Sequence, residues 1–181
     1  HHLIPKNLLP EHPVCTWLTK DYTENKKYQL AADTRYSSDH ANNGYCLPFA
    51  STTHQWNELE GDPKAQDEVA FRMMEKTGKQ LHQGNHNNQD FDEEDQDKID
   101  EYLTAAKKLL TRIFRAATAH VRACEHCKKK QSGDKIEVQP LDKVVDQLDM
   151  ASRIMKMKID ANRVFVSQRA YDYYAISVSY T

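Results

Sequence analysis

The chain has 181 residues, of which 39% are hydrophobic, and its 25 Lys/Arg against 27 Asp/Glu give a net charge of −2. This length allows one domain with a real core, and the composition excludes a chain that is disordered throughout. The charge excludes a uniformly basic nucleic-acid coat, and no apolar run approaches the roughly 18 residues of a membrane span.

The N-terminal 40 residues predict one short strand followed by a long, polar connection. His1-His2-Leu3-Ile4-Pro5 is expected to be a strand, because the run is apolar after the histidines and Pro5 ends it. Residues 6–40 are expected to be irregular, with Trp17-Leu18 anchored in the core and a short element at Leu30-Ala31-Ala32. A connection this long inside a compact domain is usually functional.

The next stretch predicts a turn and a second strand. Asn43-Gly44 is a turn signal, and it also occurs in ordinary hairpins. Tyr45-Cys46-Leu47 reads as the strand, and Pro48 closes it. Residues 50–61 are expected to be a loop in which Trp56 packs against the core.

A helix is predicted over residues 62–78. Asp62 is a typical N-cap, Pro63 suits the first helical position, and Gly78 is a typical stop signal. Its methionines, Met73 and Met74, are expected to fill the core.

A histidine pair follows this helix, in the sequence His82-Gln83-Gly84-Asn85-His86. Side chains four residues apart share one face of a helix, as two ligands of one metal ion must. Gly84 weakens such a helix, so His82 in a turn and His86 at the next helix start is the other arrangement that we expect. A surface pair without metal is the bland alternative.

A long helix is predicted from about Asp92 to Val121, where apolar residues keep a helical spacing. Residues 90–101 hold eight acids and residues 107–130 hold eight Lys/Arg. That order complements the helix dipole, so it need not mark DNA contact.

The rest of the chain predicts a loop, a helix and a possible C-terminal β-hairpin. Lys128, Lys129 and Lys130 lie in the loop and are the candidate nucleic-acid-binding residues. Residues 141–155 have the pattern of an amphipathic helix. Arg163–Ser167 and Tyr173–Tyr180 are rich in β-branched and aromatic residues, which favours a hairpin. The expected fold class is therefore α+β, mainly helical.

The four cysteines leave two interpretations open. Cys124 and Cys127 form a C-x-x-C pair that could be half of a zinc site, with Cys15 and Cys46 completing it. The other interpretation is reduced cysteines in the core of a protein that acts in the cytosol.

The histidine pair at the start, the Asn43-Gly44-x-x-Leu47-Pro48 turn and the later His82-x-x-x-His86 occur in one order. This order resembles the AHH-type nucleases of the HNH/endonuclease VII (His-Me finger) superfamily, which are common as bacterial toxin domains. The resemblance covers about residues 1–110. It implies a small ββα-metal core with additional helices: a nuclease core over residues 1–126 and a C-terminal extension of unknown role over residues 127–181.

The resemblance also implies roles for individual residues. His1, His82 and His86 would be the metal ligands, His2 the general base, and Asn43 either an orienting residue or a ligand. A neutral histidine suits the base, because its ordinary pKa of about 6.5 lets it accept a proton near neutral pH. One divalent ion is expected, Mg²⁺ in the cell and Zn²⁺ or Ni²⁺ on imidazole ligands in the purified protein.

The implied function is a metal-dependent endonuclease that hydrolyses DNA, as an antibacterial toxin or effector domain. Its partners would be DNA and a cognate immunity protein. It would be secreted or injected by the producing bacterium, by a type VI route for example, and act in the cytoplasm of the target cell. The alternatives are a non-catalytic zinc-binding interaction module on Cys124 and Cys127, and a metal-free helical domain whose terminal histidines remain from a purification tag.

Overall fold

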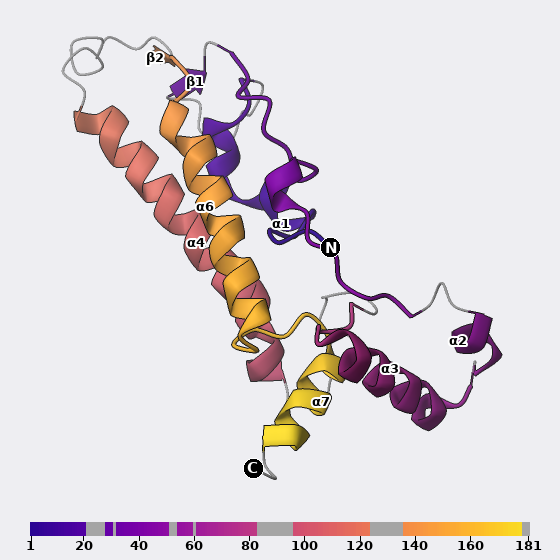
Figure 1. Ribbon diagram of the computed structural model, residues 1–181. Helices are drawn as coiled ribbons and strands as arrows, with labels where there is room; N and C mark the ends of the chain where they lie inside the picture. Colours follow the sequence, from indigo (N-terminus) through magenta and orange to yellow (C-terminus); the bar gives the residue numbers. More distant parts are fainter. Residues whose placement is uncertain are drawn as a thin grey trace. The chain divides into compact units, whose positions relative to one another are not determined.

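The computed structural model describes residues 1–20, 28–30, 32–50, 54–59, 61–82, 96–123 and 136–178. The described part is mainly helical, as the sequence predicts (Figure 1). In chain order its elements are α1 (Leu8–Glu11), η1 (Pro13–Trp17), β1 (Tyr28–Leu30), η2 (Ala41–Asn43), α2 (His54–Glu58), α3 (Pro63–Thr77), α4 (Gln96–Ala123), β2 (Ile136–Val138), α6 (Asp142–Asp160) and α7 (Gln168–Val178). Among these described helices, none combines the length and apolar character needed to cross a bilayer.

The chain divides into two compact units. Unit 1 contains His1, Tyr45–Thr104 and Met155–Thr181, and unit 2 contains His2–Gly44 and Ala105–Ile154. Helices α4 and α6 each contribute residues to both units. The boundary expected near residue 126 lies outside the described residues.

Unit 1 has a core in which α3 packs against α7 (Figure 1). Buried Trp56, predicted to pack, belongs to this core together with Ala70 and Met74 of α3 and Ala170 of α7. Arg169 fastens α7 to α3, because its Nε lies 2.7 Å from Asp67 Oδ1, and its guanidinium lies over the Trp56 ring. Leu81 belongs to the same core, so the segment after α3 that carries His82 is packed against it.

The buried apolar side chains of unit 2 come from the N-terminal segment and from parts of α4 and α6. Trp17 and Leu18 are almost fully buried, as the sequence predicts. Strands β1 and β2 form a two-stranded parallel sheet with Tyr28 opposite Ile136. The pairing joins residues more than 100 positions apart, which local patterns do not show.

The predicted helices are confirmed with small shifts at their ends. For α3, the Asp62 carboxylate accepts a hydrogen bond from the Ala65 N–H, and Gly78 ends the helix in the left-handed conformation with φ 62°. The helix predicted from about residue 92 is described from Gln96 to Ala123, and the one predicted over 141–155 runs from Asp142 to Asp160.

The two predicted N-terminal strands are not regular strands, and this prediction needs correction. An isolated antiparallel bridge pairs His2 with Gly44, and hydrogen bonds from Leu3 N to Asn43 O and from Tyr45 N to His1 O flank it. The pairing stops there because the chain bends after His2. The expected irregular stretches also contain short elements, namely α1, η1 and β1 before residue 40 and α2 after residue 50.

The predicted C-terminal hairpin is wrong. Residues 168–178 form α7, and residues 163–167 connect it to α6 without a strand. Tyr173 and Tyr174 pack against the core of unit 1, so the aromatic side chains that suggested a strand serve helix packing. Residues 179–181 lie outside the described residues.

Candidate functional site

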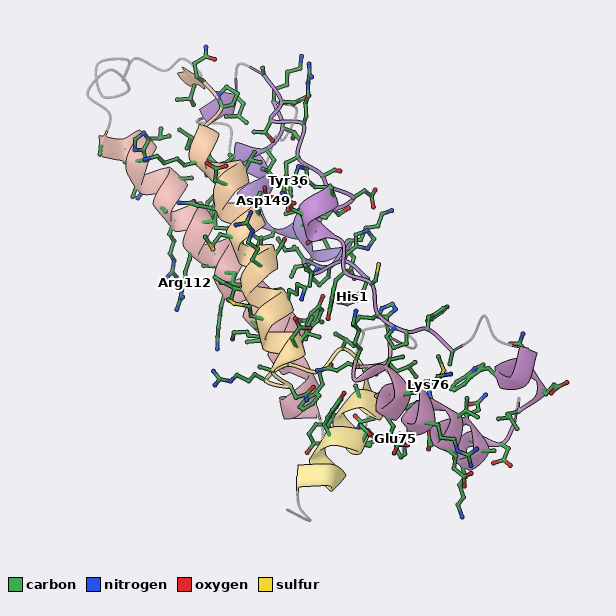
Figure 2. All side chains as sticks on the ribbon, in the orientation of Figure 1. His1, Tyr36, Glu75, Lys76, Arg112 and Asp149 are labelled. Carbon is green, nitrogen blue, oxygen red and sulfur yellow. The ribbon has the colours of Figure 1, made fainter. Side chains whose placement is uncertain are left out.

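His1 and His82 come together within unit 1, although 80 residues separate them. Their ring centroids are 4.8 Å apart at an interplanar angle of 59°. One short segment holds both backbones, since Tyr45 N donates to His1 O at 2.9 Å and His82 N donates to Pro48 O at 2.9 Å. The segment from Tyr45 to Pro48 therefore holds the backbones of two histidines that the resemblance assigns to one metal ion. Figure 2 labels His1.

Tyr102 of α4 orients the His1 ring. Its hydroxyl lies 2.8 Å from His1 Nε2, and only 1% of the residue is exposed. Burial raises the pKa of Tyr102 far above its ordinary value, so the side chain stays a neutral phenol. When His1 Nε2–H donates to this phenol, the lone pair lies on Nδ1, the tautomer in which Nδ1 can bind a metal. The helical spacing of apolar residues from about Asp92 to Val121 includes Tyr102 but gives no sign of this contact.

His2 has a carboxylate partner within unit 2. His2 Nε2 lies 2.9 Å from Asp39 Oδ1, and Lys6 Nζ lies 3.7 Å from the other Asp39 oxygen. The hydrogen bond from His2, followed by the charge of Lys6, lowers the pKa of Asp39. A carboxylate on one imidazole nitrogen fixes the orientation of the ring. The sequence identifies Asp39 only as a loop residue.

Asn43 is fully buried, and both ends of its side-chain amide make hydrogen bonds within the protein. Its amide group donates to Ile4 O at 2.9 Å and to Ser38 O at 2.8 Å. Its carbonyl oxygen accepts from Ile4 N at 2.6 Å and from Ser152 Oγ at 3.1 Å. Of the two roles that the resemblance left open, this geometry favours the orienting one, because a ligand would have to displace these bonds.

A second histidine–carboxylate contact fastens the loop that carries Asp39. His40 Nδ1 lies 3.3 Å from Asp149 Oδ1 on α6, and Asn42 donates to Asp149 Oδ2 at 2.7 Å. The His40 ring also stacks on Tyr36 with a centroid distance of 4.9 Å. Figure 2 labels Tyr36 and Asp149 of this group. The residues that directly follow Asp39 are therefore held against α6.

The described residues contain only part of the predicted site. His86, Cys124, Cys127 and Lys128–Lys130 lie outside them. Within the described ranges, no group of three or more His, Cys, Asp or Glu side chains could hold a metal ion. Burial raises the pKa of Cys15 to about 11, and its thiol donates to Leu9 O. Cys46 is exposed.

No protein family, curated protein or solved structure matches the chain. The site therefore has to be interpreted from its own residues.

Proposed function

We propose that this protein is a metal-dependent endonuclease that hydrolyses DNA phosphodiester bonds. The observation that carries the proposal is the His1–His82 ring pair, 4.8 Å between centroids, in a chain where His2 directly follows His1. The contact joins two of the three residues that the resemblance assigns to the metal. A small ββα unit around the His2–Gly44 bridge is part of the same proposal.

The donor set fits a divalent ion of the transition series. Two half-buried imidazoles are ligands that suit Zn²⁺ or Ni²⁺, and Tyr102 gives His1 the outer hydrogen bond that ligating histidines usually have. His86 would be the third ligand, and Mg²⁺ is the ion proposed for the cell. When bound, the ion would neutralise the phosphate and stabilise the departing oxygen.

The chain itself supplies the proton transfer. His2 accepts the proton of the attacking water as general base, and Asp39 on its Nε2 orients the ring and stabilises the imidazolium that forms. Asn43 acts as a positioning residue, because it holds the Ile4 backbone two residues after His2.

The biological setting follows from the resemblance alone. We propose an antibacterial toxin or effector domain that is secreted or injected, acts on DNA in the cytoplasm of the target cell and is neutralised by a cognate immunity protein. Expression of the protein in a bacterium should then stop its growth. Co-expression with the product of a neighbouring reading frame tests this setting, because an immunity protein would restore the growth of that bacterium.

The nuclease proposal is tested by plasmid nicking and metal analysis on the same samples. His2→Ala should keep the bound metal and lose about 10²–10⁴-fold in cleavage rate, the usual effect of removing a general base. His82→Ala should lose both metal and cleavage, and a chelator should abolish cleavage by the wild type. The control is His120→Ala, because His120 is exposed near the end of α4. It should match the wild type.

Three results would contradict the proposal. Absence of cleavage by the wild type with every divalent metal would exclude nuclease activity. Full activity in both His2→Ala and His82→Ala would remove the histidines from the site. Tight zinc that is lost only on substitution of Cys124 or Cys127 would identify the interaction module instead.

A further inference from the structure

Unit 1 contains a hollow of about 410 Å³ where two helices end. Its wall includes Gly78, at which α3 stops, and Asp160, the last residue of α6. Tyr45, Lys79 and Lys156 also line it. The sequence gave none of these residues a functional role; it marked only Gly78 as a helix stop and Tyr45 as a strand residue.

The hollow is connected to the candidate site by the backbone. Tyr45 lines it and also donates its N–H to His1 O at 2.9 Å. Lys79 lies three residues before His82 in the segment that follows α3. A group bound in the hollow would therefore lie next to the chain segments that hold both imidazoles.

Two lysines converge on the Tyr45 ring. Lys156 Nζ lies 4.6 Å from the ring centroid and Lys79 Nζ lies 5.2 Å from it. Lys79 donates to Cys46 O at 3.3 Å, and Lys156 donates to Asp160. An ammonium group has three N–H donors, so these bonds leave N–H groups on both lysines for an anion.

The one carboxylate of the hollow does not cancel this charge. Asp160 accepts hydrogen bonds from Tyr45 on one oxygen and from Lys156 on the other. Burial acts to raise the pKa of Asp160, but these two bonds and the charges of Lys156 and Lys79 outweigh it, so the pKa is lowered. Two ammonium groups against one carboxylate leave a net positive charge, which matches the single negative charge of a phosphodiester.

We propose that Lys79 and Lys156 bind a backbone phosphate of the nucleic-acid substrate in this hollow. The inference rests on the proposed function, because it assigns a binding site to the nucleic-acid substrate of that function. Two ammonium groups bind phosphate as point charges without reading the base sequence. Tyr45 keeps the two lysines near each other through its ring and through its bond to Asp160.

The test is the affinity of the metal-free protein for a short fluorescent DNA duplex, measured in chelator over about 50–200 mM salt. Lys79→Ala and Lys156→Ala should each weaken binding about fivefold near 0.15 M salt and reduce the salt slope by about 1. The matched control is Lys76→Ala, because Lys76 is an exposed lysine in the last turn of α3 (Figure 2). It should change neither quantity as much.

Asp160→Asn gives a test that misfolding cannot imitate. The amide still accepts a hydrogen bond, but the hollow loses its negative charge, so this variant should bind the duplex more tightly than the wild type. Weaker or unchanged binding by Asp160→Asn would overturn the proposal, as would equal losses in Lys76→Ala and Lys156→Ala.

Cleavage measured separately with metal distinguishes the two proposals. If the wild type nicks plasmid but the lysine variants bind like the Lys76 control, the phosphate site is wrong and the nuclease proposal stands. If the wild type neither binds nor cleaves DNA, both are wrong. If it binds DNA with the expected lysine dependence and never cleaves it, the phosphate site stands as a binding site and the nuclease proposal fails.

Discussion

Each unit of the molecule contains a buried side-chain amide that forms hydrogen bonds with backbone groups far away in the sequence. In unit 2, Asn43 is fully buried and bonds to the backbone of Ile4, two residues after His2. In unit 1, Gln80 is 2% exposed and precedes His82 by two residues. Its Nε2 donates to Ile159 O and Val164 O, both at 2.9 Å, and its Oε1 accepts from Val166 N at 3.0 Å.

The two amides replace missing secondary structure. Neither the segment after His2 nor the connection between α6 and α7 forms a strand or a helix, so their buried backbone groups need other partners. One side-chain amide offers both donors and acceptors, and it does so without charge. The difference lies in the partners. Asn43 bonds to backbone groups and to the buried hydroxyl of Ser152. Gln80 also donates to the side chain of Asn162, which is an exposed residue.

Asn43→Ala should produce the largest loss of stability, because it leaves Ile4 N, Ile4 O and the buried Ser152 hydroxyl without this partner. We expect a decrease of about 2–4 kcal/mol in the free energy of unfolding, measured by urea denaturation. Asn42→Ala is the control, since Asn42 is exposed and makes its bond to Asp149. Equal losses in the two variants would show that burial of the amide is not what matters.

Gln80→Ala should have a smaller effect of about 1–3 kcal/mol, because Asn162 can turn to water and only backbone partners are left buried. Its distinctive consequence should be local. Hydrogen exchange should increase at the Val166 amide, which donates to Gln80, more than at amides of unit 2. Gln66→Ala, at a partly exposed glutamine of α3, serves as the control. A uniform increase across both units would contradict a local role for Gln80.

The comparison also shows which features a sequence can predict. Helix α3 was predicted at both ends, because Asp62, Pro63 and Gly78 act on the backbone within a few residues of themselves. The tyrosines near the C-terminus predicted a strand, but packing of Tyr173 and Tyr174 against unit 1 selects a helix. Pairing of β1 with β2 depends on residues far apart in the chain, and no local pattern predicts it.

The same distinction holds for the candidate site. The resemblance, carried by residue type and order, named His1, His2, Asn43 and His82 as candidates, and the structure brings the rings of His1 and His82 together. Their partners were not predictable, because Tyr102, the partner of His1, lies in the apolar pattern of a long helix, and Asp39, the partner of His2, lies in a stretch with no pattern of its own. A buried polar partner is recognised by what surrounds it in space, which the sequence of one chain does not give.

His12 of unit 2 is a third buried side chain that holds the backbone, and it makes the stability of this unit depend on pH. Its effect should be smaller than those of Asn43 and Gln80. His12 Nδ1 accepts from Val14 N at 3.1 Å, so the neutral ring carries its proton on Nε2 and donates to Thr111 Oγ of α4. Burial, and to a lesser degree the charge of Lys107, lowers the pKa of His12. Unlike the amides, this anchor can be protonated.

The sign of the pH effect follows from the lowered pKa. Below about pH 6.5 the unfolded chain protonates this histidine while the folded protein does not, so the unfolded state binds more protons. The contribution of His12 to stability is complete above that pH and is lost as the pH falls toward the folded pKa. One proton limits the loss to about 1.4 kcal/mol per pH unit.

The test compares His12→Gln, which cannot titrate at this position, with the wild type. The free energy of unfolding is measured by urea denaturation at neutral pH and again below about pH 6.5, and it should fall less in His12→Gln. His120→Gln, at an exposed site, should follow the wild type. Parallel decreases for the wild type and His12→Gln would mean that His12 is not the titrating anchor of unit 2.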